Sequence, residues 1–264
     1  MPILPNFLII GTGRAGSSWL NSCLNEHPDI FMYQDELRFF DINYKKGVEW
    51  YKSHFQEWAG ELIVGEKSPH YLASDHAPQR IRHVLGKDVN LIAVLRHPVD
   101  RVYSNYLRFI RNGVLPVKTD FEKFYFENTY LRDEGLYFQH LQRYLKYFSK
   151  DRLLVLLFEE NIIRNRVNTL ATCFQFLGVS LDLIPKRVDV KINASKDPRI
   201  FARHAYKFRK VIKTFPPPVE NKLIEYGKRF FVRIPKKGNA EKLEDDLRQN
   251  LLSEFDDDIN QLES

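Results

Sequence analysis

The chain has 264 residues, of which 44% are hydrophobic and 28% are charged, and its net charge is +6. This length and composition predict one large globular domain with a sizeable core. No apolar run approaches the length of a membrane span, and residues 1–5 show no signal peptide, so we expect a cytoplasmic protein without a membrane span. The positive charge suits an anionic ligand without identifying one.

The first expected element is a short buried strand at residues 7–10, followed by a glycine-rich turn and a helix at 17–26. Three glycines stand within six positions, at 11, 13 and 16, and Ser17 or Ser18 is expected near the N-cap of the helix. Glycines let the backbone approach a phosphate, and the N–H groups at a helix start point toward it. This stretch therefore predicts a phosphate-binding loop.

The loop differs from the Walker A pattern G-x-x-x-x-G-K-[ST] in one position. Gly11, Gly16 and Ser18 have the right spacing, but Ser17 stands where the lysine belongs and the cation is Arg14. An arginine stays charged and can hold two oxygens with one fork. We therefore expect a phosphate-like group here, without the usual arrangement for a nucleoside triphosphate.

Further apolar runs at 30–33, 61–66, 90–96 and 152–158 predict strands that alternate with helices at 76–86, 98–113, 136–148 and 167–177. The alternation predicts an α/β, P-loop-like three-layer fold with a central, mostly parallel sheet flanked by helices. Residues 243–262 repeat apolar positions every three or four residues, which predicts one amphipathic helix. We expect a single domain over 1–264, with its core at about 6–200 and a helical portion at about 200–264. Both cysteines lie in apolar, helix-like runs, which indicates buried free thiols.

Charged residues at the predicted strand ends are the candidates for chemistry. Glu36, Lys67 and Arg96 follow three different strands and should converge with Arg14, because ligands bind at the carboxyl edge of such sheets. Arg96 stands where a P-loop kinase would carry a Mg²⁺-binding aspartate, so we expect no metal site. Arg96, Arg101 and Ser104 together suggest a second phosphate site, and a surface ion pair is the alternative for Arg101.

These motifs resemble the sulfotransferases that use 3′-phosphoadenosine 5′-phosphosulfate (PAPS). Residues 11–20 look like the 5′-phosphosulfate loop, and residues 96–106 match the 3′-phosphate pattern R-x-P-x-x-R-x-x-S-x-Y. Residues 35–41, 66–71 and 135–141 resemble the K-E-x-x-F-F, E-K-[ST]-P-x-Y and G-x-Y-x-x-x-L stretches of the heparan-sulfate branch. Residues 193–199 look like the N-x-S-x-x-P-[RK] segment of bacterial relatives. Arg14 departs from the family, which usually has lysine there.

The resemblance implies in-line sulfuryl transfer from PAPS, leaving adenosine 3′,5′-bisphosphate (PAP). Glu36 would be the general base, Arg14 would stabilise developing charge, and Lys67 would lie near the sulfuryl group or the acceptor. The cofactor would be held by the loop residues Gly13, Arg14, Ala15, Gly16, Ser17 and Ser18. Arg96 and Ser104 would hold the 3′-phosphate, Ser195 would also bind the cofactor, and Arg199 would close over it.

The acceptor implied by this resemblance is a hydroxyl or amine, on a carbohydrate or another small molecule. Aromatic residues in 39–58 and 121–130 are candidates to stack on it. The sequence does not indicate an oligomeric state.

Two other functions are considered. A P-loop nucleotide kinase or NTPase would need a lysine at position 17 and a strand-end aspartate for Mg²⁺. A non-catalytic polyanion-binding protein could use residues 186–237, which hold 16 Lys/Arg against 4 Asp/Glu. No motif that reads RNA or DNA occurs there, so we expect no nucleic-acid partner.

Overall fold

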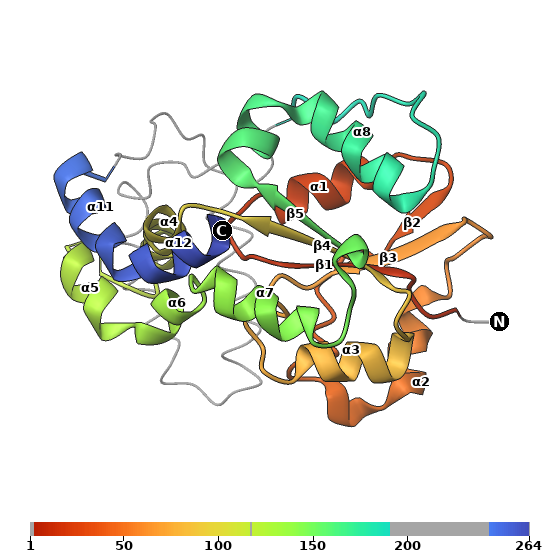
Figure 1. Ribbon diagram of the computed structural model, residues 1–264, viewed down its shortest axis with the longest axis horizontal. Coiled ribbons are helices and arrows are strands. Elements are labelled where there is room, and N and C mark those ends of the chain that lie inside the picture. The colour runs from red at the N-terminus through yellow and green to blue at the C-terminus, as the bar shows by residue number, and fades with distance from the viewer. Residues whose placement is uncertain (1–2, 117, 191–242, 264) are drawn as a thin grey trace. The chain divides into compact units, whose positions relative to one another are not determined.

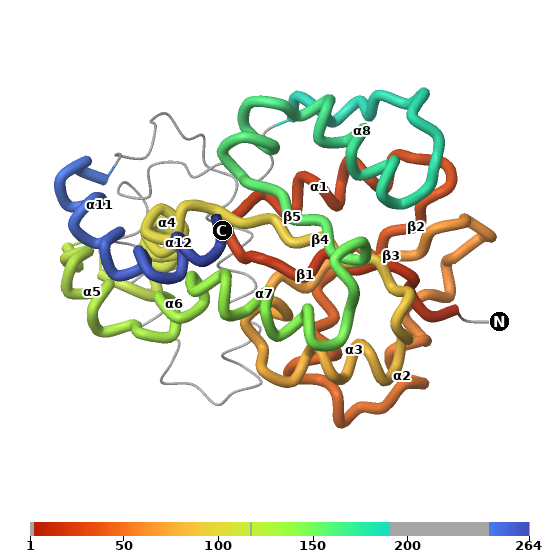
Figure 2. Tube along the Cα trace, viewed as in Figure 1, coloured from red at the N-terminus to blue at the C-terminus, as the bar shows by residue number. Residues whose placement is uncertain are grey.

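The computed structural model describes residues 3–116, 118–190 and 243–263. Its centre is a five-stranded sheet in the order β2-β3-β1-β4-β5, in which every pair of neighbours is parallel. The strands are β1 (Phe7–Gly11), β2 (Ile30–Met32), β3 (Ile63–Lys67), β4 (Asn90–Leu95) and β5 (Leu153–Leu157). This parallel sheet, which can be followed along the tube in Figure 2, confirms the predicted fold class.

Alternate residues of β1 belong to two different hydrophobic cores, because successive side chains of a strand point to opposite faces. Phe7 and Ile9 pack on the face covered by α1 (Ser17–Leu24) and α8 (Arg166–Leu177). Leu8 and Ile10 pack on the face covered by α3 (Ala77–Leu85) and α7 (Tyr137–Leu145). Figure 1 shows these two pairs of helices on opposite sides of the sheet, which makes the three layers.

The remaining described helices are α2 (Val48–Lys52), α4 (Pro98–Arg111), α5 (Phe121–Glu127), α6 (Thr129–Asp133), α11 (Asp245–Leu252) and α12 (Asp256–Glu263). Short 3-10 turns are formed by Tyr44–Lys46, Ser53–Phe55, Lys150–Arg152 and Ser253–Phe255, and a π-helical segment by Phe158–Arg164. No helix among the described residues is both long and apolar enough to cross a membrane. Cys23 and Cys173 are buried free thiols, as predicted, and burial raises the pKa of each to about 12.

The prediction of one helix over 243–262 is wrong. The segment forms α11 and α12, separated by the 3-10 turn Ser253–Phe255. The Ser253 hydroxyl donates to the Asn250 carbonyl (2.7 Å), a bond that competes with a continuing helical ladder. Three aspartates, Asp256 to Asp258, then fill the first turn of α12, where negative charge favours a new helix start.

Asp258 completes α7 from a distant part of the chain. Its carboxylate accepts hydrogen bonds from the backbone N–H groups of Phe138 (2.9 Å) and Gln139 (3.2 Å), while the N-cap residue Leu136 makes no side-chain cap. The first turn of a helix has N–H groups without partners inside the helix, so this carboxylate stabilises α7. Figure 2 shows α12 beside α7.

The described residues fall into two compact units. One holds the sheet, residues up to 97, the segment from 133 to 190 and α12. The other holds α4, α5 and α11, where Arg248 makes two bonds to Asp100 (2.8 and 3.0 Å). In that second unit Tyr106, Phe121 and Phe124 pack ring against ring. The single domain over 1–264 stays a prediction.

Candidate active site

The turn after β1 folds as the glycine spacing predicted, although the cap of α1 is not a serine. Gly16 is the N-cap, with φ +83°, and Arg14 has φ +71°, so two residues of this turn are left-handed. Ser17 and Ser18 instead form the first turn of α1, and Gly16 has no side chain to cap it. Left-handed residues in such a turn direct successive N–H groups into a concave, anion-binding backbone.

Two glycines of this turn have different surroundings. A Cβ on Gly16 would lie 2.9 Å from Ile162 Cγ2 and 3.2 Å from the Phe158 ring. A Cβ on Gly13 would have nothing within 4 Å. The backbone at Gly16 is therefore pressed against the π-helical segment, whereas the backbone at Gly13 faces open space.

Arg96, which directly follows β4, binds the turn after β1 through its side chain. Its Nη1 donates to the carbonyl of Arg14 (2.9 Å), and its guanidinium lies 4.8 Å from the centre of the Phe158 ring. The Tyr137 hydroxyl of α7 donates to the carbonyl of Arg96 (2.6 Å). The structure thus brings two of the predicted site residues, Arg14 and Arg96, into direct contact.

The predicted catalytic pair is also in contact. Lys67, the last residue of β3, donates from Nζ to Glu36 Oε1 (2.7 Å) and to Ser18 Oγ (3.3 Å). The Lys67 side chain is 8% exposed and that of Glu36 is 39% exposed. Glu36 lies in the loop after β2 rather than at the strand end, because β2 already ends at Met32. One buried lysine therefore links the carboxylate to the start of α1.

A buried carboxylate next to Lys67 was not assigned from the sequence. Glu66 is completely buried, and its oxygens accept hydrogen bonds from Tyr51 OH (3.2 Å), Tyr71 OH (2.8 Å) and Ser68 Oγ (2.8 Å). Burial raises the pKa of Glu66 to about 7, although the three hydroxyl donors oppose this shift. Burial and the Glu66 charge raise the pKa of Tyr51 and Tyr71. The sequence signal was a charge inside an apolar strand, which needs partners when buried.

The residues predicted for a second phosphate site are placed only in part. Arg101 is completely buried on α4 and donates to the Leu131 carbonyl, so it does not lie at the surface, as the alternative expected. Ser104 is buried on α4, in the other unit from Arg96, and each is described within its own unit. Ser195 and Arg199 lie outside the described residues.

Several aromatic residues that were candidates to stack on an acceptor belong to the core instead. Phe39, Phe40 and Tyr51 are completely buried, and the Phe39 and Tyr51 rings stack with centroids 4.4 Å apart. A side chain with no exposed surface cannot contact an acceptor, so these three are excluded.

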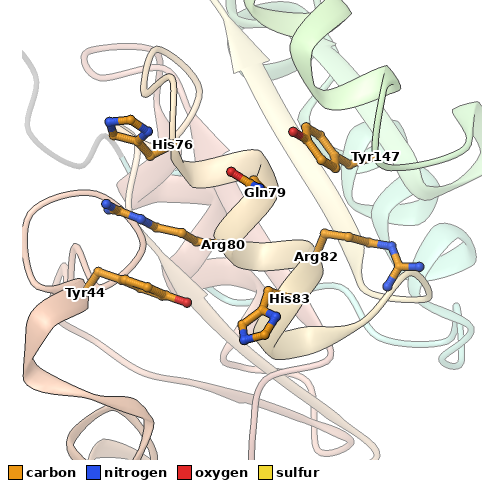
Figure 3. A pocket seen from close by; sticks show the side chains of 7 residues that line it. All are labelled: Tyr44, His76, Gln79, Arg80, Arg82, His83 and Tyr147. Carbon is orange, nitrogen blue, oxygen red and sulfur yellow. The ribbon is translucent and has the colours of Figure 1, made fainter.

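A separate hollow of about 640 Å³ lies over α3 (Figure 3). Its lining is polar and basic, from Tyr44, His76, Gln79, Arg80, Arg82, His83 and Tyr147. Figure 3 shows Arg80 and Tyr44 side by side, and the Arg80 guanidinium lies 4.5 Å from the centre of the Tyr44 ring. Tyr44 is one of the candidate aromatic residues in 39–58, but none of the predicted catalytic or cofactor-binding residues lines this hollow.

A parallel sheet with a glycine turn between its first strand and first helix defines a P-loop-like α/β protein. Within that class, the family model of the sulfotransferase domain matches residues 4–210, and the chain belongs to the sulfotransferase family. This confirms the resemblance seen in the sequence, and PAPS is the sulfuryl donor of this class of enzyme.

Three known proteins show the relationship. Human heparan sulfate glucosamine 3-O-sulfotransferase 6 is 31% identical over 189 residues, covering 66% of this chain and 52% of that protein. Human heparan sulfate glucosamine 3-O-sulfotransferase 3B1 is 32% identical over 185 residues, covering 67% and 46%. The crystal structure of a sulfotransferase from Alicyclobacillus acidocaldarius matches with a TM-score of 0.65 and 26% identity, covering 88% of this chain and all of that one. The chain spans about half the length of the curated relatives it matches.

Proposed function

We propose that this chain transfers the sulfuryl group of PAPS to a hydroxyl or amine of an acceptor, with Glu36 as the general base. The observation that carries the proposal is the contact of Lys67 with both Glu36 and Ser18. Through this contact Lys67 connects Glu36, whose carboxylate can accept a proton, to the start of α1. Helix α1 follows the turn whose backbone is suited to bind an anion. A base and an anion site bridged by one cation are the parts that sulfuryl transfer needs.

The residues of the turn after β1 fit PAPS, the proposed sulfuryl donor. The left-handed Arg14 and Gly16 shape the turn, and the open space beside Gly13 leaves its backbone accessible. Under the proposal the 5′ end is held by the turn and the start of α1, namely Gly13, Arg14, Ala15, Gly16, Ser17 and Ser18. Arg96 and Ser104 hold the 3′-phosphate, Ser195 also binds the cofactor, and Arg199 closes over it. When bound, PAPS supplies the sulfuryl group and leaves as PAP.

In the proposed reaction Glu36 accepts the proton of the acceptor's hydroxyl or amine at its carboxylate. The other partner of Lys67, Ser18, belongs to the first turn of α1. Protonation of Glu36 removes the negative charge that holds Lys67, so the lysine charge can then act on the anion at the turn. Arg14 and the N–H groups of the turn stabilise negative charge at the same place. These fixed cations take the part that a metal ion plays in phosphoryl transfer, so we expect activity to survive EDTA.

A carbohydrate is the proposed acceptor. The support is the sequence identity with two proteins named heparan sulfate glucosamine 3-O-sulfotransferases, each matched over about half of its length. The acceptor would approach the exposed part of Glu36, whose side chain is 39% accessible.

The test combines labelled PAPS with a panel of sugars, lipids and phenols. Glu36→Gln keeps the shape of the side chain but cannot accept a proton at neutral pH. We expect turnover to fall by roughly 10²–10⁴, with PAP affinity nearly unchanged by calorimetry. The control is Asp35→Asn, because Asp35 is exposed and directly precedes Glu36.

If Asp35→Asn abolishes transfer while Glu36→Gln keeps more than about a tenth of the turnover, the base is wrongly assigned. If ATP with Mg²⁺ binds and PAP does not, the protein is a nucleotide kinase or NTPase instead.

A further inference from the structure

The loop that carries Glu36 rests on the buried Glu66 cluster. The backbone N–H of Arg38 donates to Ser68 Oγ (3.0 Å), and the N–H of Phe40 donates to the Tyr71 hydroxyl (3.3 Å). Both hydroxyls in turn donate to Glu66, at 2.8 Å each. Two peptide groups within four residues of Glu36 are therefore connected to one buried carboxylate through one hydroxyl each.

Both hydroxyls donate to Glu66, whose carboxylate accepts one of them at each of its two oxygens. A hydroxyl has one proton, and an ionised carboxylate can only accept. Because Ser68 and Tyr71 both give their protons to Glu66, their lone pairs are left to accept from the backbone of the loop. A group that donated at position 66 would turn the proton of one hydroxyl away from this site and compete with the loop N–H for the lone pairs of that hydroxyl, which weakens its bond to the loop.

The same loop is held on its carbonyl side. Arg80 Nη1 donates to the carbonyls of Phe40 (3.0 Å) and Asp41 (2.7 Å), and Asn43 Nδ2 donates to the carbonyl of Leu37 (2.8 Å). The Leu37 side chain is only 5% exposed, so the residue directly after Glu36 is anchored in the core. The cluster therefore adds two bonds from loop N–H groups to a loop whose carbonyls are already held.

We propose that Glu66 is a positioning residue, which holds the 37–41 loop through Ser68 and Tyr71 and so keeps Glu36 against Lys67. This rests on the proposed role of Glu36 as the base. Glu66 itself touches neither the acceptor nor the donor. It acts through two hydroxyls on the backbone that carries the base, and a displacement of about 1 Å can lower a rate about 10²-fold.

The chain offers a matched control. Tyr51 also donates to Glu66 and is as buried as Tyr71, but within the part of the chain that the structure describes its hydroxyl accepts from no N–H of the 37–41 loop. Tyr51→Phe and Tyr71→Phe each remove one bond to the same carboxylate. Only Tyr71→Phe also removes the acceptor of the Phe40 N–H. A role in overall stability would affect both variants alike, and a positioning role affects only Tyr71→Phe.

The experiment measures kcat, PAP affinity and amide hydrogen exchange in Glu66→Gln, Ser68→Ala, Tyr71→Phe and Tyr51→Phe. We expect Glu66→Gln and Tyr71→Phe to lower kcat by about 10- to 100-fold with PAP affinity within about twofold, while Tyr51→Phe keeps kcat within about twofold. The Phe40 amide should exchange faster in Tyr71→Phe, and the Arg38 amide faster in Ser68→Ala.

Equal losses of kcat in Tyr51→Phe and Tyr71→Phe would overturn the proposal, as would wild-type exchange at both amides in Glu66→Gln. If Glu66→Gln does not fold, kcat and amide exchange in Tyr71→Phe, Tyr51→Phe and Ser68→Ala test the proposal instead. Amide exchange is measured without a sulfuryl acceptor and without turnover. It therefore reports on the 37–41 loop even if Glu36 proves not to be the base.

Discussion

Replacing Gly16 by alanine tests the turn after β1, because two separate features of the structure oppose any side chain there. The backbone has φ +83°, a left-handed conformation that costs an L-residue roughly 1–2 kcal/mol. The new Cβ would also lie 2.9 Å from Ile162 Cγ2, and Ile162 is 2% exposed within the core. Overpacking of this kind costs about 1–3 kcal/mol. The sum is about 2–5 kcal/mol, a large part of the roughly 5–15 kcal/mol that stabilises a domain.

Urea unfolding followed by circular dichroism measures this loss. With a slope of about 2.5 kcal/mol per molar urea, the midpoint should fall by about 1–2 M. The control is Gly13→Ala, whose Cβ would have nothing within 4 Å, so its midpoint should stay close to that of the wild type. Gly13→Ala should nevertheless weaken PAP binding if the open space beside it is where the phosphosulfate lies. A Gly16→Ala protein that unfolds at the wild-type midpoint would refute the reasoning.

Three further predictions concern Arg96, Asp258 and Glu66. Arg96→Ala should weaken binding of PAP by about 1.5–3 kcal/mol and binding of AMP by less, measured by calorimetry, since one charge-assisted phosphate contact is lost; equal losses would mean that Arg96 does not face the 3′-phosphate. Asp258→Ala removes the carboxylate that accepts from two N–H groups of α7 and should lower the free energy of unfolding by about 0.5–2 kcal/mol, with no change if the cap is unimportant. The pKa of Glu66 is raised from 4.5 to about 7, so the folded state binds the extra proton and the contribution of this group to stability falls as pH rises between these values. The wild-type unfolding free energy should therefore drop from pH 5 to pH 8 by roughly 2.5 kcal/mol more than that of Glu66→Gln, and parallel pH profiles would contradict it.

The sequence predicted features that depend on neighbouring residues in the chain. Apolar runs and the glycine spacing at 11, 13 and 16 were enough for the parallel sheet and the turn. Glu36 and Lys67 were expected to converge because the carboxyl ends of parallel strands share one edge of a sheet, and the structure places them 2.7 Å apart.

The features that the sequence did not predict depend on contacts between residues far apart in the chain. The Glu66 cluster takes Tyr51 from α2 and Tyr71 from the segment after β3, so no local pattern could reveal it. Arg101 had two interpretations, a phosphate contact or a surface ion pair, since nothing nearby in the sequence shows that it is completely buried with Leu131 as a partner. Periodicity over 243–262 could not show the break at Ser253, because the apolar spacing continues through it. The roles of the site residues toward the donor and the acceptor stay predictions.

The carboxylate of Asp258 also has a consequence for the time course of folding during translation. It caps α7 from a position 120 residues after Phe138. At about 5–20 residues per second, a ribosome needs roughly 6–24 s to make the residues between them. During that interval the first turn of α7 lacks this cap, although α7 also supplies the Tyr137 hydroxyl that bonds to the Arg96 carbonyl. The nascent chain can thus begin to build its sheet while α7 still lacks this cap, which is added only after α12 has been synthesised.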